Sequence, residues 1–242
     1  MDIKQMNFEL LDVEGSYNVR DLGGYRGTGG APIKKRRFIR AGALSRVTGR
    51  GMEQLTGLGV RCVIDLRSAG EAVRAPDPVL HHESIAYHHI PMMDYLQSNI
   101  DSGDFSTFPA SMEEMYRGLL DKAQGQLCKV FRMIALARTA VLFHCTAGKD
   151  RTGVVTMLLL LLAGVDEAAV IEDYSWSERL IAPLLETQSS MKFPSYSHQS
   201  QPGTMEATIR YLKESYGGAR SYLTGIGIGA AEQAMILEKC FE

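Results

Sequence analysis

Several features are scarce in this sequence, and each absence narrows what the chain can be. Only four of its 242 residues are cysteines, and no two stand close together, so the sequence predicts neither a disulfide framework nor a zinc cluster. The formal net charge of −2 gives no overall attraction to nucleic acid. The first residues lack the apolar stretch of a secretory signal, and the longest mainly apolar run, residues 154–163, is too short to span a membrane. These absences predict a cytoplasmic protein, or one exported without an ordinary signal peptide.

One cysteine nevertheless stands in an informative context. Cys145 and Arg151 are separated by five residues in the sequence His-Cys-Thr-Ala-Gly-Lys-Asp-Arg-Thr-Gly, which covers residues 144–153. Cysteine and arginine at this distance are a weak signal alone. When the flanking His, Gly and Thr are also required, the probability that the pattern occurs by chance in such a chain falls to about one in ten thousand. Residues 140–143 predict a buried strand before the motif, and residues 153–163 predict a buried helix after it. The motif is therefore expected on a strand-loop-helix turn.

Such a turn directs backbone N–H groups and a helix N-terminus toward one point, which makes a cradle for a tetrahedral anion. The same surroundings favour the thiolate of Cys145, the candidate nucleophile, while Arg151 can donate two parallel hydrogen bonds to phosphoryl oxygens. Thr152 could hydrogen-bond the sulfur as it leaves, and His144 could orient the loop. The other residues expected around the substrate are Thr146, Ala147, Gly148 and Lys149. The sequence thus predicts a phosphate monoester hydrolase with a cysteinyl-phosphate intermediate and with no metal or cofactor.

At this point the residues resemble a known family, the prokaryotic-type tyrosine phosphatases of broad specificity, which are related to dual-specificity and phosphoinositide phosphatases. Besides the motif, the stretch Asn-Val-Arg-Asp-Leu-Gly-Gly at 18–24 is similar to the family's N-terminal element, although Val19 stands where Phe is common. The segments 40–46, 55–59 and 63–67 also follow that family's order. The resemblance implies that phosphotyrosine is the main substrate. Within the motif, the variant with Lys149 and Asp150 implies activity on phosphoinositides as well.

A general acid is needed when the leaving group is an alkoxide, as with phosphoserine, phosphothreonine or an inositol ring. Three aspartates are candidates. Asp150 lies in the cradle itself, where neighbouring negative charge could keep it protonated, and the resemblance favours it because the family carries this residue in the loop. Asp94 follows a predicted strand and opens a loop, and Asp65 ends the predicted strand 61–66, at a sheet edge where such sites form. The sequence leaves these three alternatives open.

Alternating helices and strands predict an α/β fold in three layers, in which a central, mainly parallel sheet is flanked by helices, as in tyrosine phosphatases. We expect one phosphatase domain over residues 1–242, with a turn-rich loop at 18–30 and a lid or mobile loop within 183–204. A polar connection at 99–111 is a second segment that could move over the site. The predicted strands cover 37–44, 60–66, 87–91 and 140–143, and the predicted helices cover 112–136 with a break near Gly125, 153–163, 166–180, 204–216 and 230–241.

Two other classes of function remain as alternatives. A similar loop could carry out thiol-dependent sulfur transfer or arsenate reduction, but neither Cys62 nor Cys128 is an evident resolving cysteine. A non-catalytic phosphate-binding module would not need both Cys145 and Arg151. The expected partners are a phosphorylated protein or phosphoinositide as substrate and phosphate as product or inhibitor, with no nucleic acid and no stable insertion into a membrane.

Overall fold

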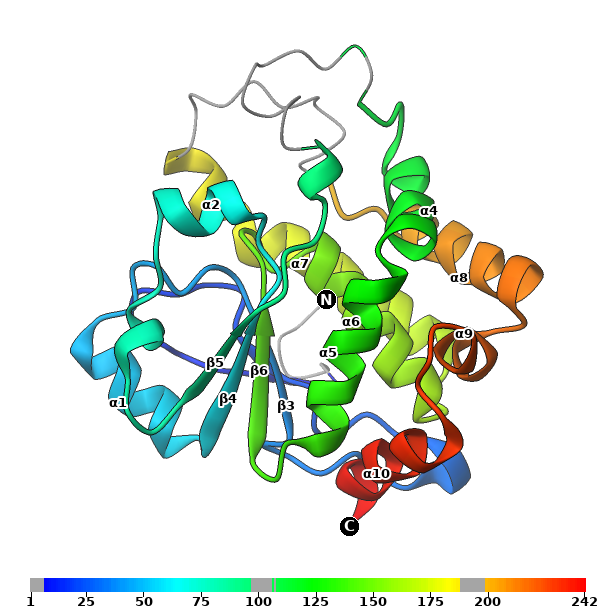
Figure 1. The fold of residues 1–242 in the computed structure, drawn as a ribbon, viewed down its shortest axis with the longest axis horizontal. Coiled ribbons are helices and arrows are strands. Elements are labelled where there is room, and N and C mark those ends of the chain that lie inside the picture. The colour runs from blue at the N-terminus through cyan, green and yellow to red at the C-terminus, as the bar shows by residue number, and fades with distance from the viewer. Residues whose placement is uncertain (1–6, 97–105, 107, 188–198) are drawn as a thin grey trace.

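The computed structural model describes residues 7–96, 106, 108–187 and 199–242 of the chain. Six strands form one sheet in the order β1-β2-β3-β6-β4-β5 (Figure 1). The pairs β3–β6, β6–β4 and β4–β5 are parallel, whereas β1–β2 and β2–β3 are antiparallel. The prediction of a mainly parallel sheet is therefore confirmed. The strands are β1 (Glu9–Leu10), β2 (Arg20–Asp21), β3 (Phe38–Ala41), β4 (Val60–Asp65), β5 (Ala86–His89) and β6 (Ala140–His144).

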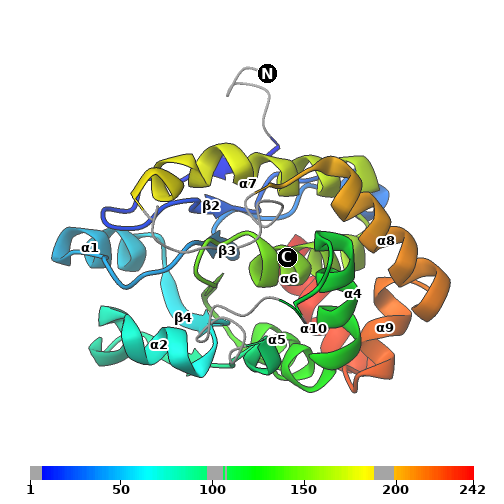
Figure 2. The ribbon, with the colours of Figure 1, turned by 90° about the horizontal axis from the view of Figure 1, so that it is seen from above.

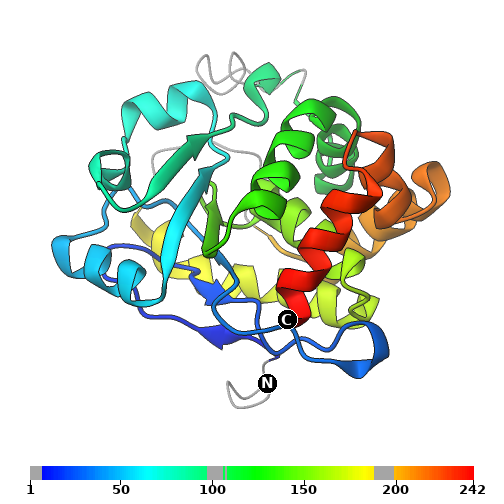
Figure 3. The same cartoon turned by 60° about the horizontal axis from the view of Figure 1, so that its bottom comes forward.

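Helices flank the sheet on both sides, which confirms the predicted α/β class. Helix α1 lies on one side, and α4, α5, α6 and α10 lie on the other (Figures 1 and 3). The α-helices are α1 (Gly49–Gly57), α2 (Ala69–Arg74), α4 (Met112–Lys122), α5 (Gln124–Leu136), α6 (Asp150–Leu162), α7 (Glu167–Thr187), α8 (Pro202–Tyr216), α9 (Ala219–Gly225) and α10 (Ala230–Phe241). Short 3₁₀ turns are η2 (Thr28–Gly30), η3 (Pro78–His81) and η4 (Asp94–Leu96).

Strand β6 separates two apolar cores because successive side chains of a strand point to opposite faces. Val141 and Phe143 belong to the larger core, which includes residues of α4, α5, α6 and α10, whereas Ala140 and Leu142 belong to the smaller core beneath α1. Helix α6 is apolar around most of its circumference, and ten of its residues are buried, so it is a core helix as predicted.

The motif lies where the parallel strands end. Asp65 at the end of β4 stands in register with His144 at the end of β6, and the chain then forms the loop 145–149 before entering α6. This confirms the predicted strand-loop-helix turn. Seen from above, α2 and α4 stand on opposite sides of this edge of the sheet (Figure 2).

Several details differ from the expectation. The segment 18–30, predicted as loop, contains β2, because Arg20 and Asp21 pair with both β1 and β3. The break in the helix 112–136 falls at Ala123, and α7 continues to Thr187 instead of ending at residue 180. Helices α2 and α9 were not predicted, because both are short.

The predicted mobile segments lie largely outside the described residues. Residues 99–105 and 107 of the first segment, and residues 188–198 of the second, lie outside the described part of the chain. Within the described residues, no helix combines the length and the apolar character that crossing a membrane requires.

Candidate active site

The carbonyl groups at the start of the loop are tied away from its centre. Thr146 O accepts hydrogen bonds from the Tyr17 hydroxyl at 2.6 Å and from the backbone N–H of Ala43 at 3.0 Å. Ala147 O accepts one from Asn18 Nδ2 at 3.0 Å. Because these carbonyls point to the N-terminal segment and to the residues after β3, the loop N–H groups are left to face the opposite side, as an anion cradle requires.

Gly148 continues this arrangement. Its carbonyl accepts hydrogen bonds from Asn18 Nδ2 at 3.0 Å and from Arg40 Nη2 at 2.7 Å. Its φ is +67°, and a Cβ atom there would lie 2.4 Å from Ala41 O. The position therefore requires glycine, for both its backbone conformation and its close approach to β3. Asn18 itself has a φ of 55°, a conformation that asparagine tolerates better than most residues.

Arg151, in the first turn of α6, is held by Glu71 of α2. Its Nη1 and Nη2 atoms lie 2.5 and 3.0 Å from the two carboxylate oxygens of Glu71. The Thr146 hydroxyl also donates to Glu71, and Glu71 completes a capping box with Ser68 at the start of α2. One carboxylate thus fixes the orientation of the guanidinium and also joins α2 to the loop.

The charges in this pair reinforce one another. Burial by itself raises the pKa of Glu71, but the charge of Arg151 and hydrogen bonds from Arg151 and Thr146 hold that pKa well below its usual range. Burial alone would lower the pKa of Arg151, but the negative charges of Glu71 and Cys145 outweigh this effect. The pKa of Arg151 therefore lies above its usual range. Glu71 remains a carboxylate near neutral pH. The thiol of Cys145 lies close enough to Arg151 to act on it electrostatically.

Two donors in the first turn of α6 have no hydrogen-bond partner within the described part of the chain. They are Arg151 Nε and the Thr152 hydroxyl, and both atoms are buried. A buried donor without a partner is costly, so such atoms are commonly completed by a ligand. Cys145 itself is 1% exposed. The structure places Cys145 within electrostatic reach of Arg151, and Thr152 follows Arg151 in the first turn of α6.

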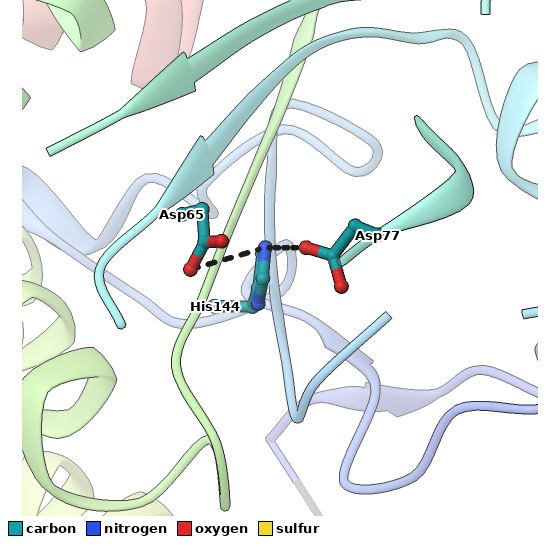
Figure 4. Close-up of side chains that lie close together, drawn as sticks. All are labelled: Asp65, Asp77 and His144. Carbon is teal, nitrogen blue, oxygen red and sulfur yellow. Dashed lines mark ion pairs between the residues drawn. The ribbon is translucent and has the colours of Figure 1, made fainter. Parts of the chain in front are cut away.

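His144, which precedes the cysteine in the chain, belongs to a buried ion-pair network with Asp65 and Asp77 (Figure 4). Its Nε2 atom is 3.1 Å from Asp77 and 3.8 Å from Asp65. Two carboxylates and an imidazole within 4.8 Å of one another are a possible ligand set for a metal ion. However, Arg67 Nη2 already lies 2.7 Å from Asp65 and 2.8 Å from Asp77, so a guanidinium supplies the positive charge there. We interpret the cluster as a structural support for His144.

Asp65 is fully buried within this network. It accepts hydrogen bonds from Arg67 and, at 2.6 Å, from the Tyr87 hydroxyl. Burial by itself raises the pKa of Asp65, but His144, Arg67 and Tyr87 together hold that pKa well below its usual range. Its carboxylate is ionised at neutral pH and fully engaged.

Asp150 stands at the start of α6, between the loop and α4. Its Oδ1 atom accepts a hydrogen bond from the Tyr116 hydroxyl at 2.7 Å and lies 2.8 Å from Lys149 Nζ. The Tyr116 hydroxyl is also 3.1 Å from the Tyr174 hydroxyl. Lys149 is buried and donates to Gln199 O at 2.9 Å. The side chain of Asp150 is 23% exposed, so it is held in place and remains accessible.

Asp94, the third aspartate, is exposed on η4. Its Oδ1 atom accepts a hydrogen bond from the backbone N–H of Ala69, the first residue of α2. Because the same helix carries Glu71, Asp94 lies next to an element of the site, although no described contact joins Asp94 to the loop.

Several residues that support the loop were not predicted from the sequence. Glu71, Tyr17 and Tyr116 had no expected role, and Asn18 and Arg40 stood only within segments that resemble the family. One signal was present for Glu71, because Ser-x-x-Glu at residues 68–71 is the pattern of a capping box. That pattern predicts a helix start but not which cation the carboxylate meets.

The chain is similar to known tyrosine phosphatases. The chain is 35% identical over 213 residues to a tyrosine-protein phosphatase of Nostoc commune, covering 81% of this chain and 71% of that protein. It is 27% identical to the triple specificity protein phosphatase PtpB of Mycobacterium tuberculosis, covering 92% and 95% of the two chains. A solved structure of P. aeruginosa TpbA in complex with pTyr is 12% identical, with a TM-score of 0.48 and coverage of 94% and 100%. The sequence model of a family described as "Tyrosine phosphatase family" matches residues 11–242 of the chain. The chain therefore belongs to the tyrosine phosphatase family, and its enzyme class is protein tyrosine phosphatase.

Proposed function

We propose that this tyrosine phosphatase hydrolyses phosphate monoesters in two steps through Cys145. The Sγ atom forms a bond to phosphorus while the bond from phosphorus to the leaving oxygen breaks. Water then attacks phosphorus, the phosphorus–sulfur bond breaks, and inorganic phosphate leaves. The observation that supports this proposal best is the outward anchoring of the carbonyls of Thr146, Ala147 and Gly148, because it leaves their loop's N–H groups for the phosphoryl oxygens.

Arg151 stabilises the charge that develops on the phosphoryl group in this proposal. Glu71 accepts one hydrogen bond from each Nη atom, and the buried Nε–H has no hydrogen-bond partner among the described residues, so it remains available to the phosphoryl group. A donor that is already oriented needs little reorganisation as charge develops, which is the property that lowers a barrier most effectively. The Thr152 hydroxyl, which has no hydrogen-bond partner among the described residues, stabilises the sulfur when it leaves phosphorus.

We assign proton donation to Asp150 in preference to the other two aspartates. Asp150 is in the loop, is partly exposed, and is oriented by Tyr116. Asp65 is a poor donor because its pKa is held low, and Asp94 has no described contact with the loop. In the first step Asp150 gives its proton to the leaving oxygen, and in the second its carboxylate takes a proton from the attacking water.

Phosphotyrosine is the main substrate in this proposal, and the range extends to phosphoserine, phosphothreonine and phosphoinositides. Alkyl esters need a proton donor, which Asp150 supplies, and Lys149 adds a cation inside the loop that suits substrates of high negative charge. The relative named a triple specificity phosphatase supports a broad range.

The test uses the full chain with p-nitrophenyl phosphate, a phosphotyrosyl peptide and a phosphoinositide, each in the presence of a chelator. Cys145→Ser should abolish turnover, whereas the matched variant Cys128→Ser should keep it, because Cys128 lies far from the loop, near Gly227. Rapid acid quenching should trap phosphate on the wild-type protein and not on Cys145→Ser. Turnover by Cys145→Ser, or none by the wild type, would refute the proposal.

The proton donor has its own test. Asp150→Asn should slow hydrolysis of an alkyl phosphate far more than that of p-nitrophenyl phosphate, whose leaving group needs little protonation. Asp94→Asn serves as the matched comparison. If Asp94→Asn instead produced the substrate-dependent loss, the role would belong to Asp94.

A further inference from the structure

A second buried charge cluster lies behind the loop, and its charges do not balance. It contains Arg20, Arg40 and Asp173, whose side chains are all at most 1% exposed. Arg20 Nε lies 2.9 Å from Asp173 Oδ1, and Arg40 Nη1 pairs with Asp173 Oδ2. The cluster therefore has two guanidinium groups for one carboxylate.

The neighbouring groups do not supply the missing negative charge. Among the described residues, the other groups that contact the Arg20 side chain are uncharged, namely Asn18, the Ser177 hydroxyl at 3.0 Å, the Asp173 carbonyl at 2.9 Å and the ring of Phe8. Tyr25 donates to Asp173 at 3.2 Å, and its pKa lies far above neutrality because of burial and the nearby carboxylate, so it stays uncharged. Burial and Arg20 lower the pKa of Arg40 only to about 10, so Arg40 also remains charged at neutral pH.

The sheet makes this arrangement more costly. Arg20 and Arg40 are direct cross-strand partners in the antiparallel pair β2–β3, where like charges repel. Arg40 Nε is buried and has no hydrogen-bond partner in the described part of the chain. An uncompensated buried charge destabilises a fold by several kcal/mol. Features that lower stability in this way are expected where function requires them.

The excess charge is directed at the nucleophile. Arg40 Nη2 donates to Gly148 O inside the loop, and Cys145 is among the groups that act electrostatically on Arg40. Cys145 also acts electrostatically on Tyr17 and Arg151. Of the two cations, Arg151 is neutralised by Glu71, so Arg40 carries the positive charge that no carboxylate fully compensates.

The network around His144 does not have this property. There the carboxylates of Asp65 and Asp77 face the guanidinium of Arg67 and one imidazole, so that side of the loop gains no net positive charge. The cluster of Arg20, Arg40 and Asp173 is thus the source of excess positive charge behind the loop.

We propose that Arg40 is a positioning residue whose uncompensated buried charge stabilises the thiolate of Cys145 and the phosphoryl group bound above it. This inference rests on the proposed function, in which Cys145 attacks as a thiolate. A purely structural role, in which Arg40 only holds Gly148, predicts that added negative charge in the cluster would be harmless or stabilising.

Ser177→Asp separates the two roles, because it adds a carboxylate beside Arg20 and leaves every residue of the loop in place. The readout is the pH dependence of Cys145 alkylation by iodoacetamide, followed by mass spectrometry of the peptide that contains Cys145. Neutralising the excess charge should slow alkylation about three- to tenfold below the midpoint of the profile and shift that midpoint to higher pH. Ser175→Asp, on the same helix but bonded to Ile171 O, is the matched control and should follow the wild type.

A second pair of variants keeps the test decisive if Ser177→Asp does not fold. Arg40→Lys retains the charge and should keep the wild-type alkylation profile, whereas Arg40→Met should shift it. The proposal would be overturned if the alkylation profile of Arg40→Met, or that of a folded Ser177→Asp, coincided with the wild-type profile. Alkylation does not depend on turnover, so an inactive wild type would refute the proposed function without deciding this inference.

Discussion

Glu71 offers the sharpest test of how the site is oriented. Glu71→Gln keeps the size of the side chain but removes the charge that holds Arg151 at 2.5 and 3.0 Å. Both side chains are largely buried, at 19% and 11% exposed, so the pair is screened only weakly by water. A guanidinium displaced by about 1 Å can reduce a rate by about a hundredfold. This corresponds to about 2.7 kcal/mol of transition-state stabilisation.

The assay is steady-state hydrolysis of p-nitrophenyl phosphate near neutral pH. We expect kcat to fall about a hundredfold with little change in KM, because the oriented guanidinium acts mainly on the transition state. Glu53→Gln, at an exposed position on α1, is the matched control and should not change either constant. An unchanged kcat would refute the reasoning. A faster variant would instead mean that Glu71 competes with the substrate for Arg151.

The stability difference between the wild type and Glu71→Gln should depend on pH. The pKa of Glu71 in the folded protein lies below its ordinary value of 4.5, so its contribution is full above that pH and is lost on further acidification. The difference in Tm between the wild type and Glu71→Gln should therefore shrink as the pH falls below 4.5. A difference that stays constant down to pH 2 would contradict this expectation.

Three further predictions follow from single contacts. Tyr116→Phe removes a hydrogen bond to Asp150 and should slow alkyl phosphate hydrolysis more than aryl phosphate hydrolysis; equal effects on both substrates would argue against orientation of the acid. Gly148→Ala should destabilise the fold by about 1–3 kcal/mol in denaturant unfolding and abolish turnover, because φ is positive and the new Cβ would meet Ala41 O; wild-type stability would contradict the geometry. Burial lowers the pKa of Lys239 to about 8, below its ordinary 10.5, so between these pH values the unfolded chain binds more protons than the folded one. The free energy of unfolding should therefore rise with pH in this range more steeply in the wild type than in Lys239→Met. Parallel curves for the two proteins would contradict this prediction.

The position of the motif on a strand-loop-helix turn was predictable because the signal for it is local. Cys145 and Arg151 belong to one short motif, and its flanking apolar runs specify the strand and the helix that shape the turn. Short apolar runs likewise predicted strands of the parallel sheet, and a longer apolar run predicted the core helix α6.

The orientation of the loop depends on contacts between distant residues. Glu71 and Arg151 are 80 residues apart, and Arg40 and Gly148 are 108 apart. No periodicity in one sequence states which carboxylate meets which cation, because the strand order of the sheet brings them together. The short strand β2 was missed for the same reason, since its pairing with β1 and β3 stabilises it more than its own composition does.

The sequence by itself determined that a thiol, an arginine and a ring of backbone amides share one turn, because a contiguous motif carries that information. The tertiary structure decided which of the three aspartates remains accessible in the loop, which carboxylate orients Arg151, and that two buried arginines share Asp173. The physical reason is that burial and electrostatic pairing depend on distances in the folded chain, whereas the backbone turn depends on neighbours in sequence.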